Sequence, residues 1–192
     1  MAAQPNPLPP DVDIGPILLG VSFAFVFPSV FLTGLRVWVR ARDKTLGWDD
    51  GTILVATVLS VIMSALSINA VQHGKGRHIW YLAKEEAQHI SMLSWINQLV
   101  LFTAVTFVKS SICLLVLRIK NTKVLRVFLY TVIGFLIITN LLPIIALLVE
   151  CNPVDKFWDR ARKGTCMPPD FRIYSIWVET GMCCILQRMN IG

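Results

Sequence analysis

The chain has 192 residues, of which 55% are hydrophobic and 16% are charged, with a net charge of +6 and a mean hydropathy of +0.62. A small globular core cannot bury this much apolar surface, so lipid must solvate a large part of it. The basic residues lie in loops beside apolar spans, so we expect the lipid bilayer and its anionic headgroups, and no nucleic acid, as the counter-charge.

The chain starts with a proline-rich segment. Its first ten residues contain four prolines and no charged residue, which predicts a disordered outer tail over residues 1–13. Asp11 and Asp13 precede the first apolar span, with no Lys or Arg before it. This flank is wrong for a cleaved signal peptide, so we expect the span to be retained as a helix.

Four apolar stretches of more than twenty residues contain no Asp, Glu, Lys or Arg, and about 20 residues suffice to span a bilayer. Spans in hydrocarbon must satisfy their own backbone hydrogen bonds, which favours helices. We therefore predict an all-α, polytopic transmembrane helix bundle in a single membrane domain, residues 14–192. Its expected helices cover about residues 14–37, 50–71, 88–117 and 127–149, with a fifth, weaker one at 171–187.

The second helix has a polar start and a stripe of small residues. Asp49 or Asp50 is expected to cap its N-terminus, where a carboxylate complements free N–H groups and the helix dipole. Trp48 would then lie at headgroup level. The small residues Ala56, Ser60, Ser64 and Ser67 of this helix follow one another at spacings of four, four and three, and such stripes let two helices approach closely.

The segment that follows the second helix alternates basic residues with glycine. Flexible cationic loops rich in N–H groups can hold an anionic ligand, which makes Lys75, Arg77, His78 and Trp80 candidate outer-loop ligand contacts. The favoured alternative is a tight solvated turn in which Trp80 anchors the third helix at the interface. His73 and His78 lack acidic or thiol companions, so neither a metal site nor a cofactor is predicted.

Lys109 is the basic residue deepest within a span. Ser94, Gln98 and Lys109 share one helix face by their spacing and form a candidate intramembrane polar seam. An amine of this length can equally snorkel toward the headgroups. A retinal Schiff base is disfavoured, because Glu179, in the weak fifth helix, is the one intramembrane acid available as a counter-ion.

Cys151 and Cys166 share the loop after the fourth helix and form a candidate disulfide. In an oxidising compartment they could pair, whereas two free thiols are the alternative. No hydrolase, kinase or nucleotide-binding signature is found in the sequence.

The distribution of basic residues predicts the orientation. Residues 36–50 and 118–126 hold four Lys or Arg each, eight in total. The remaining connections also hold eight, but over longer segments that contain acidic residues. Density next to the helix ends, and the contrast across the first helix, favour an N-terminus outside.

Taken together, a series of short marks resembles the fungal rhodopsin-domain integral membrane proteins. The marks occur in the expected order over most of the chain. They are Arg36, Leu46-Gly47-Trp48-Asp49-Asp50, Gly76-Arg77-His78-Ile79-Trp80, Lys109-Ser110-Ser111, Leu117-Arg118-Ile119, and Cys151, Pro153, Trp158, Gly164 and Cys166.

This resemblance implies a seven-helix bundle with its N-terminus outside and a receptor-like role, and it does not imply retinal binding. Because the sequence ends at Gly192, we expect a product truncated after its fifth helix. The functional prediction is a receptor-like protein of the plasma membrane or secretory pathway without enzymatic activity, whose outer loops face a small extracellular ligand and whose basic inner loops face a cytosolic signalling partner. Alternatives are a transporter or pathway-associated membrane component, or an inactive truncated product.

Overall fold

The structure, a computed structural model, describes residues 11, 13–119, 122–159, 162–167 and 177. Four long helices dominate these residues, and each is long and apolar enough to cross a membrane. They are α1 (Gly15–Arg42), α2 (Trp48–Gln72), α3 (Lys84–Ile119) and α4 (Lys123–Val149). The predicted all-α transmembrane helix bundle is confirmed.

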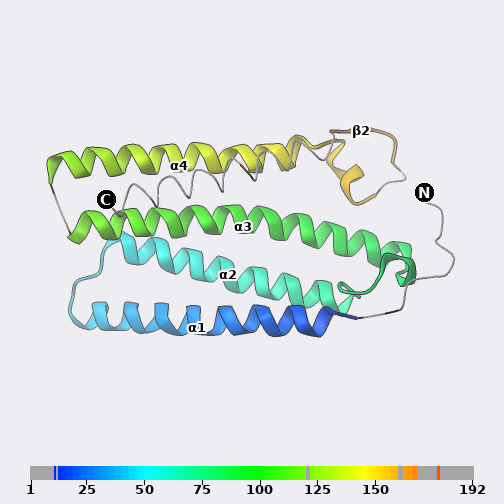
Figure 1. Cartoon of the computed structure of the whole chain (residues 1–192), viewed down its shortest axis with the longest axis horizontal. Helices are drawn as coiled ribbons and strands as arrows, with labels where there is room; N and C mark the ends of the chain where they lie inside the picture. The colour runs from blue at the N-terminus through cyan, green and yellow to red at the C-terminus, as the bar shows by residue number, and fades with distance from the viewer. Residues whose placement is uncertain (1–10, 12, 120–121, 160–161, 168–176, 178–192) are drawn as a thin grey trace.

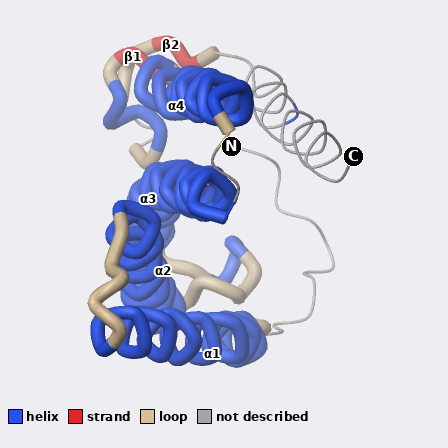
Figure 2. The backbone as a smooth tube through the Cα atoms, turned by 90° about the vertical axis from the view of Figure 1, so that its left-hand side faces the viewer, coloured by secondary structure: helices blue, strands red, loops and turns tan. Residues whose placement is uncertain are grey.

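The helices lie side by side in chain order, with α2 on α1, α3 on α2 and α4 on α3 (Figure 1). Seen end-on, they form a curved row (Figure 2). Contact is most extensive between α2 and α3. Among the described residues of α1 only Gly15 is buried, so side chains such as Phe25 and Phe27 are left for lipid to cover.

Small residues line the packed side of α2, as the sequence predicts. Ala56 and Ala70 are among the most buried residues of the chain. Ser60 donates its hydroxyl to the carbonyl of Ala56 over 3.0 Å, so this polar group is satisfied within its own helix. On the other side of α2, the Thr57 hydroxyl bonds that of Thr33 in α1 over 3.2 Å.

Each helix is longer than the apolar run that predicted it. The first ends at Arg42 instead of residue 37, and the second begins at Trp48 instead of residue 50. The third begins at Lys84 and the fourth at Lys123, each four residues before the predicted start. Helical hydrogen bonding continues into the polar boundary, where charged side chains are solvated, so a charge-free run marks only the hydrocarbon part.

Two loop regions gather at one end of the bundle, which we call the disulfide end. The loop after α2 contains the 3₁₀-helix η1 (Ile79–Tyr81). The loop after α4 contains strand β1 (Cys151–Asn152), 3₁₀-helix η2 (Val154–Phe157) and strand β2 (Thr165–Cys166), and the two strands pair antiparallel. The predicted fifth helix, residues 171–187, lies outside the described residues except for Trp177.

Candidate functional site

The opposite end of the bundle, which we call the network end, holds the α1–α2 and α3–α4 connections. Arg36 and Arg40 lie four residues apart near the end of α1, so they share one face of that helix. Their positive charge also complements the negative C-terminal end of the helix dipole. Five residues, 43–47, then return the chain to α2.

The first turn of α2 carries two buried carboxylates. Its N-cap is Gly47, not an aspartate as predicted, and the Gly47 N–H donates to Oδ2 of Asp50 over 3.1 Å. Asp49 and Asp50 therefore lie inside the first turn, where their side chains are 4% and 3% exposed. Burial of two carboxylates requires charged or hydrogen-bonding partners.

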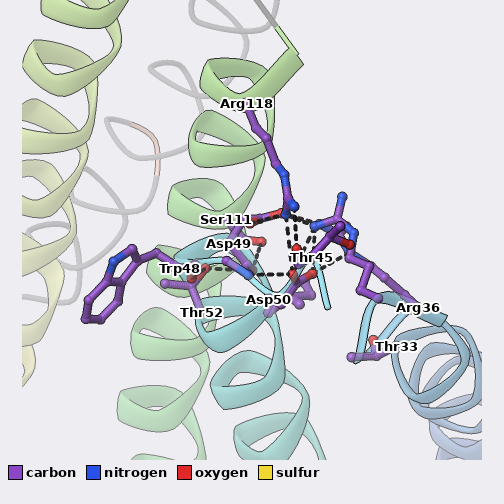
Figure 3. A network of polar contacts seen from close by, with 12 residues as sticks. Thr33, Arg36, Thr45, Trp48, Asp49, Asp50, Thr52, Ser111 and Arg118 are labelled. Carbon is purple, nitrogen blue, oxygen red and sulfur yellow. Dashed lines mark hydrogen bonds and ion pairs between the residues drawn. The ribbon is translucent and has the colours of Figure 1, made fainter. Parts of the chain in front are cut away.

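Arginines from α1 supply those partners (Figure 3). Arg36 bonds Asp49 over 2.9 Å and Asp50 over 3.2 Å. Arg40 reaches both carboxylates as well, at 2.5 Å to Asp49 and 2.8 Å to Asp50. Each guanidinium thus bridges the two aspartates: Arg36 uses Nε and Nη2, and Arg40 reaches both carboxylates through Nη1.

Helix α3 completes the cluster from the other side of α2. Arg118 lies 3.3 Å from Asp49 and 3.6 Å from Asp50, and it also donates to the backbone carbonyl of Thr45. Ser111 donates its hydroxyl to the backbone carbonyl of Asp49 over 2.9 Å. We call Arg36, Arg40, Asp49, Asp50 and Arg118 the Asp–Arg network, which joins α1, α2 and α3 at one end.

The network is partly open to its surroundings on the arginine side. Its arginine side chains are 23–36% exposed while its aspartates are buried. Three positive and two negative charges leave +1. Removing one partner of a buried pair is costly because the other charge stays uncompensated. The arrangement is therefore an ionic tie between α1, α2 and α3.

A pocket of about 290 Å³ adjoins the network. It lies where the start of α2, the end of α3 and the start of α4 meet. Its lining contains two arginines, two aromatic residues, two leucines, one aspartate and one glycine. Asp49 and Arg118 of the lining belong to the Asp–Arg network. The lining residues are Gly47, Trp48, Asp49, Leu114, Leu117, Arg118, Arg126 and Tyr130. Trp48, predicted as an interface anchor, is 87% exposed.

At the disulfide end, the N-terminal segment attaches to the loop after α2. Arg77 donates to both carboxylate oxygens of Asp11, with Nε to Oδ1 at 3.2 Å, and Ile14 N–H donates to the carbonyl of Gly76 over 3.2 Å. The Arg77 hydrogen bond lowers the pKa of Asp11 below 3.8. Asp13 accepts from the Gly15 N–H over 2.8 Å. These residues form the N-terminal clasp.

The candidate ligand contacts of that loop are divided by exposure. Arg77 and His78 are exposed, whereas Lys75 and Trp80 are half-buried. Arg77 is engaged by Asp11, so the loop holds a carboxylate of its own chain. His73 also lies next to His89 of α3, with ring centroids 4.4 Å apart. In the part of the chain that the structure describes, no three His, Cys, Asp or Glu side chains are grouped to hold a metal.

The loop after α4 is closed on itself and packed on α3. Cys151 and Cys166 form a disulfide. Trp158 packs edge-on against Trp95 with ring centroids 5.8 Å apart, and Gln88 donates to Asp159 over 2.8 Å. The loop after α4 therefore packs against the first turns of α3.

The predicted polar seam lies within α3. Ser94, Gln98 and Lys109 are all half-buried. Both interpretations of Lys109, a bundle-facing amine and a snorkelling one, stay predictions.

Sequence reasoning missed the partners of the two aspartates. The sequence marks Arg36, Ser111 and Arg118 as part of the family resemblance and Arg40 as a loop charge, and it pairs none of them with the aspartates. The available signal was the four-residue spacing of Arg36 and Arg40, with Arg40 nine positions before Asp49. Nothing local pointed to Arg118, which is 69 positions from Asp49.

Comparison with known proteins gives one result for this chain. A family model described as the fungal rhodopsin domain matches residues 35–189. No curated protein and no solved structure matches the chain. The matched range covers most of the sequence and includes α2, α3, α4 and the whole Asp–Arg network, so the chain belongs to the fungal rhodopsin-domain family of multi-pass membrane proteins.

Proposed function

We propose that this protein is a receptor-like membrane protein without enzymatic activity, in the plasma membrane or the secretory pathway. Its disulfide end lies outside and meets a small ligand or surface cue, and its network end meets a cytosolic signalling partner. The observation that carries the proposal is the Asp–Arg network, which ties three helices at one end through buried ion pairs.

A tie of this kind suits signal transmission. Packed helices with buried ion pairs tend to move between discrete arrangements instead of deforming continuously. Helices α2 and α3 are the most extensively packed pair. At their outer ends they carry the N-terminal clasp and the disulfide loop, and at their inner ends they hold Asp49 and Arg118. A shift of either loop can therefore act on the network.

The proposed orientation has two independent supports. A disulfide in the loop after α4 suits an oxidising compartment, outside the cytosol. The connections at the network end carry the denser basic charge, which favours the cytosolic side.

Signalling is tested in a strain that lacks the gene, restored with wild type or with Asp50→Asn at equal membrane abundance. Transcripts are measured after exposure to a panel of surface and chemical cues. We expect a cue response that requires wild type and is altered by Asp50→Asn. An identical transcript profile with and without the gene, for every cue, would contradict the proposal.

Orientation is tested with single substitutions that create glycosylation acceptors. Lys163→Asn makes the sequence Asn-Gly-Thr in the exposed loop after α4, and Asp43→Asn makes Asn-Lys-Thr at the network end. We expect only the Lys163→Asn protein to gain an endoglycosidase-sensitive glycan. A glycan on the Asp43→Asn protein alone would reverse the orientation.

A transporter is the second candidate, because Pro28 and Pro143 lie inside α1 and α4 and interrupted spans occur at transporter binding sites. Uptake of small metabolites into vesicles with and without the protein separates the two functions. Uptake that requires the protein, together with an unchanged cue response, would favour transport.

A further inference from the structure

The pocket beside the Asp–Arg network lies at the boundary between the bundle and its polar surroundings. It is formed where α2 and α4 begin and α3 ends. Trp48 is directed away from the carboxylates toward this side of α2 (Figure 3), and Tyr130 of α4 is also exposed. Exposed tryptophan and tyrosine at helix ends are typical of the headgroup level of a bilayer.

The charge around the pocket is positive. Arg118 and Arg126 line it, and Asp49 is the acidic residue of the lining. Asp49 is already paired with arginines of α1 and α3. Arg126 adds a second guanidinium to the lining beside that of Arg118.

Arg118 can serve the network and the pocket at the same time. Its guanidinium has five N–H donors in a planar fork, and its side chain is 36% exposed. The donors toward α2 engage Asp49 and Thr45, while the residue itself lines the pocket. An anion there would receive charge-assisted hydrogen bonds, the strong kind.

The remaining lining residues suit a lipid. Leu114 and Leu117 give the pocket an apolar wall beside its arginines. A volume of about 290 Å³ is just below the usual range of about 300–1,000 Å³ for small-molecule sites, as expected for a headgroup whose acyl chains stay outside. Basic pockets between transmembrane helices are suited to anionic phospholipid headgroups.

We propose that this pocket binds the phosphate of an anionic phospholipid headgroup, with Arg118 and Arg126 as the donors and Trp48 and Tyr130 flanking the headgroup. The pocket and the Asp–Arg network share Arg118, so a bound phosphate would add a further anionic partner to Arg118 beside Asp49. In a cell, the inference rests on the orientation given under the proposed function. The network end must face the cytosol for the lipid to come from the cytosolic leaflet.

The test uses the full chain in neutral detergent micelles, where both ends are accessible and orientation plays no part. Binding of a short-chain phosphatidylinositol bisphosphate is measured by native mass spectrometry, with short-chain phosphatidylcholine as the neutral control. The variants are Arg126→Gln, Arg126→Lys and, as a matched control, Lys123→Gln. Lys123 lies in the same turn of α4, is exposed and is not part of the lining.

We expect wild type to bind the anionic lipid more tightly than the neutral one, and Arg126→Gln to weaken binding about tenfold, the loss of one charge-assisted hydrogen bond. Arg126→Lys should fall between them, and Lys123→Gln should change binding less than about twofold. Equal losses for Arg126→Gln and Lys123→Gln would overturn the site in favour of diffuse surface attraction. Inorganic phosphate that displaces the lipid at equal concentration would overturn the lipid in favour of a soluble anion.

Discussion

The hydroxyl of Ser111 in α3 donates to the backbone carbonyl of Asp49 in α2 over 2.9 Å, and both residues are buried. This bond holds the acidic turn of α2 against α3 independently of any charge. Arg118, two helical turns further along α3, approaches the carboxylate of the same aspartate. Main chain and side chain of Asp49 are thus both held by α3.

Ser111→Ala removes the hydrogen bond from α3 to the main chain of Asp49 and leaves the ion pair with Arg118 in place. The carbonyl of Asp49 keeps a hydroxyl donor, Thr52, at 3.0 Å, so it is not left unsatisfied. We expect the free energy of unfolding in micelles to fall by about 0.5–1.5 kcal/mol, the worth of one hydrogen bond. Ser110→Ala, at the neighbouring half-buried position, is the control, and an equal loss there would contradict the assignment.

Gly76→Ala should open the N-terminal clasp. Gly76 has φ +119°, and a Cβ there would lie 2.4 Å from the backbone nitrogen of Gly15. We expect a loss of about 1–3 kcal/mol from strain and displaced backbone, measured by thermal unfolding. Gly20→Ala in α1 has open space around its Cβ and should be neutral or stabilise by up to about 1 kcal/mol. Similar effects of the two substitutions would contradict the clasp.

Acid should release the same clasp from Arg77. The pKa of Asp11 is lowered below 3.8 by the hydrogen bond from Arg77. The pair therefore contributes fully above the ordinary pKa, and its contribution is lost as the pH falls through the lowered value. A carboxyl carbon NMR titration should give Asp11 a midpoint below 3.8 in wild type and near its ordinary value in Arg77→Gln. Lys75→Gln is the control, and an unshifted Asp11 in wild type would refute the pair.

Reduction of the Cys151–Cys166 disulfide should loosen the loop packed on Trp95. The two cysteines are 15 residues apart, and closing a loop of this size is worth about 3 kcal/mol in the chain-entropy model. We expect reductant to lower the melting temperature of wild type. It should have no effect on the double variant Cys151→Ala and Cys166→Ala, which keeps the buried Cys113. An equal reductant effect on both proteins would assign it to another thiol.

The membrane helices could be predicted because a charge-free run of more than twenty residues has few alternatives in lipid. Their ends could not, since the helices continue to Arg42 and back to Lys84 and Lys123. In these turns the charged residues are compatible with the polar boundary, so hydropathy gives no signal for where the hydrogen bonding stops.

The Asp–Arg network could also be predicted only in part. The sequence places Asp49 and Asp50 correctly at the start of a helix, but it does not predict their ion pairs with arginines. A cap depends on residues a few positions away, whereas ion-pair partners depend on which helices become neighbours. Arg118 reaches Asp49 only because α3 packs on α2, and that packing involves residues along the whole length of both helices.

The most direct test of the ionic tie is a double-mutant cycle of Arg40→Gln and Asp50→Asn. Arg40 contacts Asp50 at 2.8 Å, and Asp50 is buried. With unfolding free energies measured in micelles, we expect the two losses not to be additive. The coupling should be at least about 1 kcal/mol, within the range of residues in direct contact. Losses that add to within about 0.3 kcal/mol would show that Arg40 and Asp50 act independently and would contradict the network.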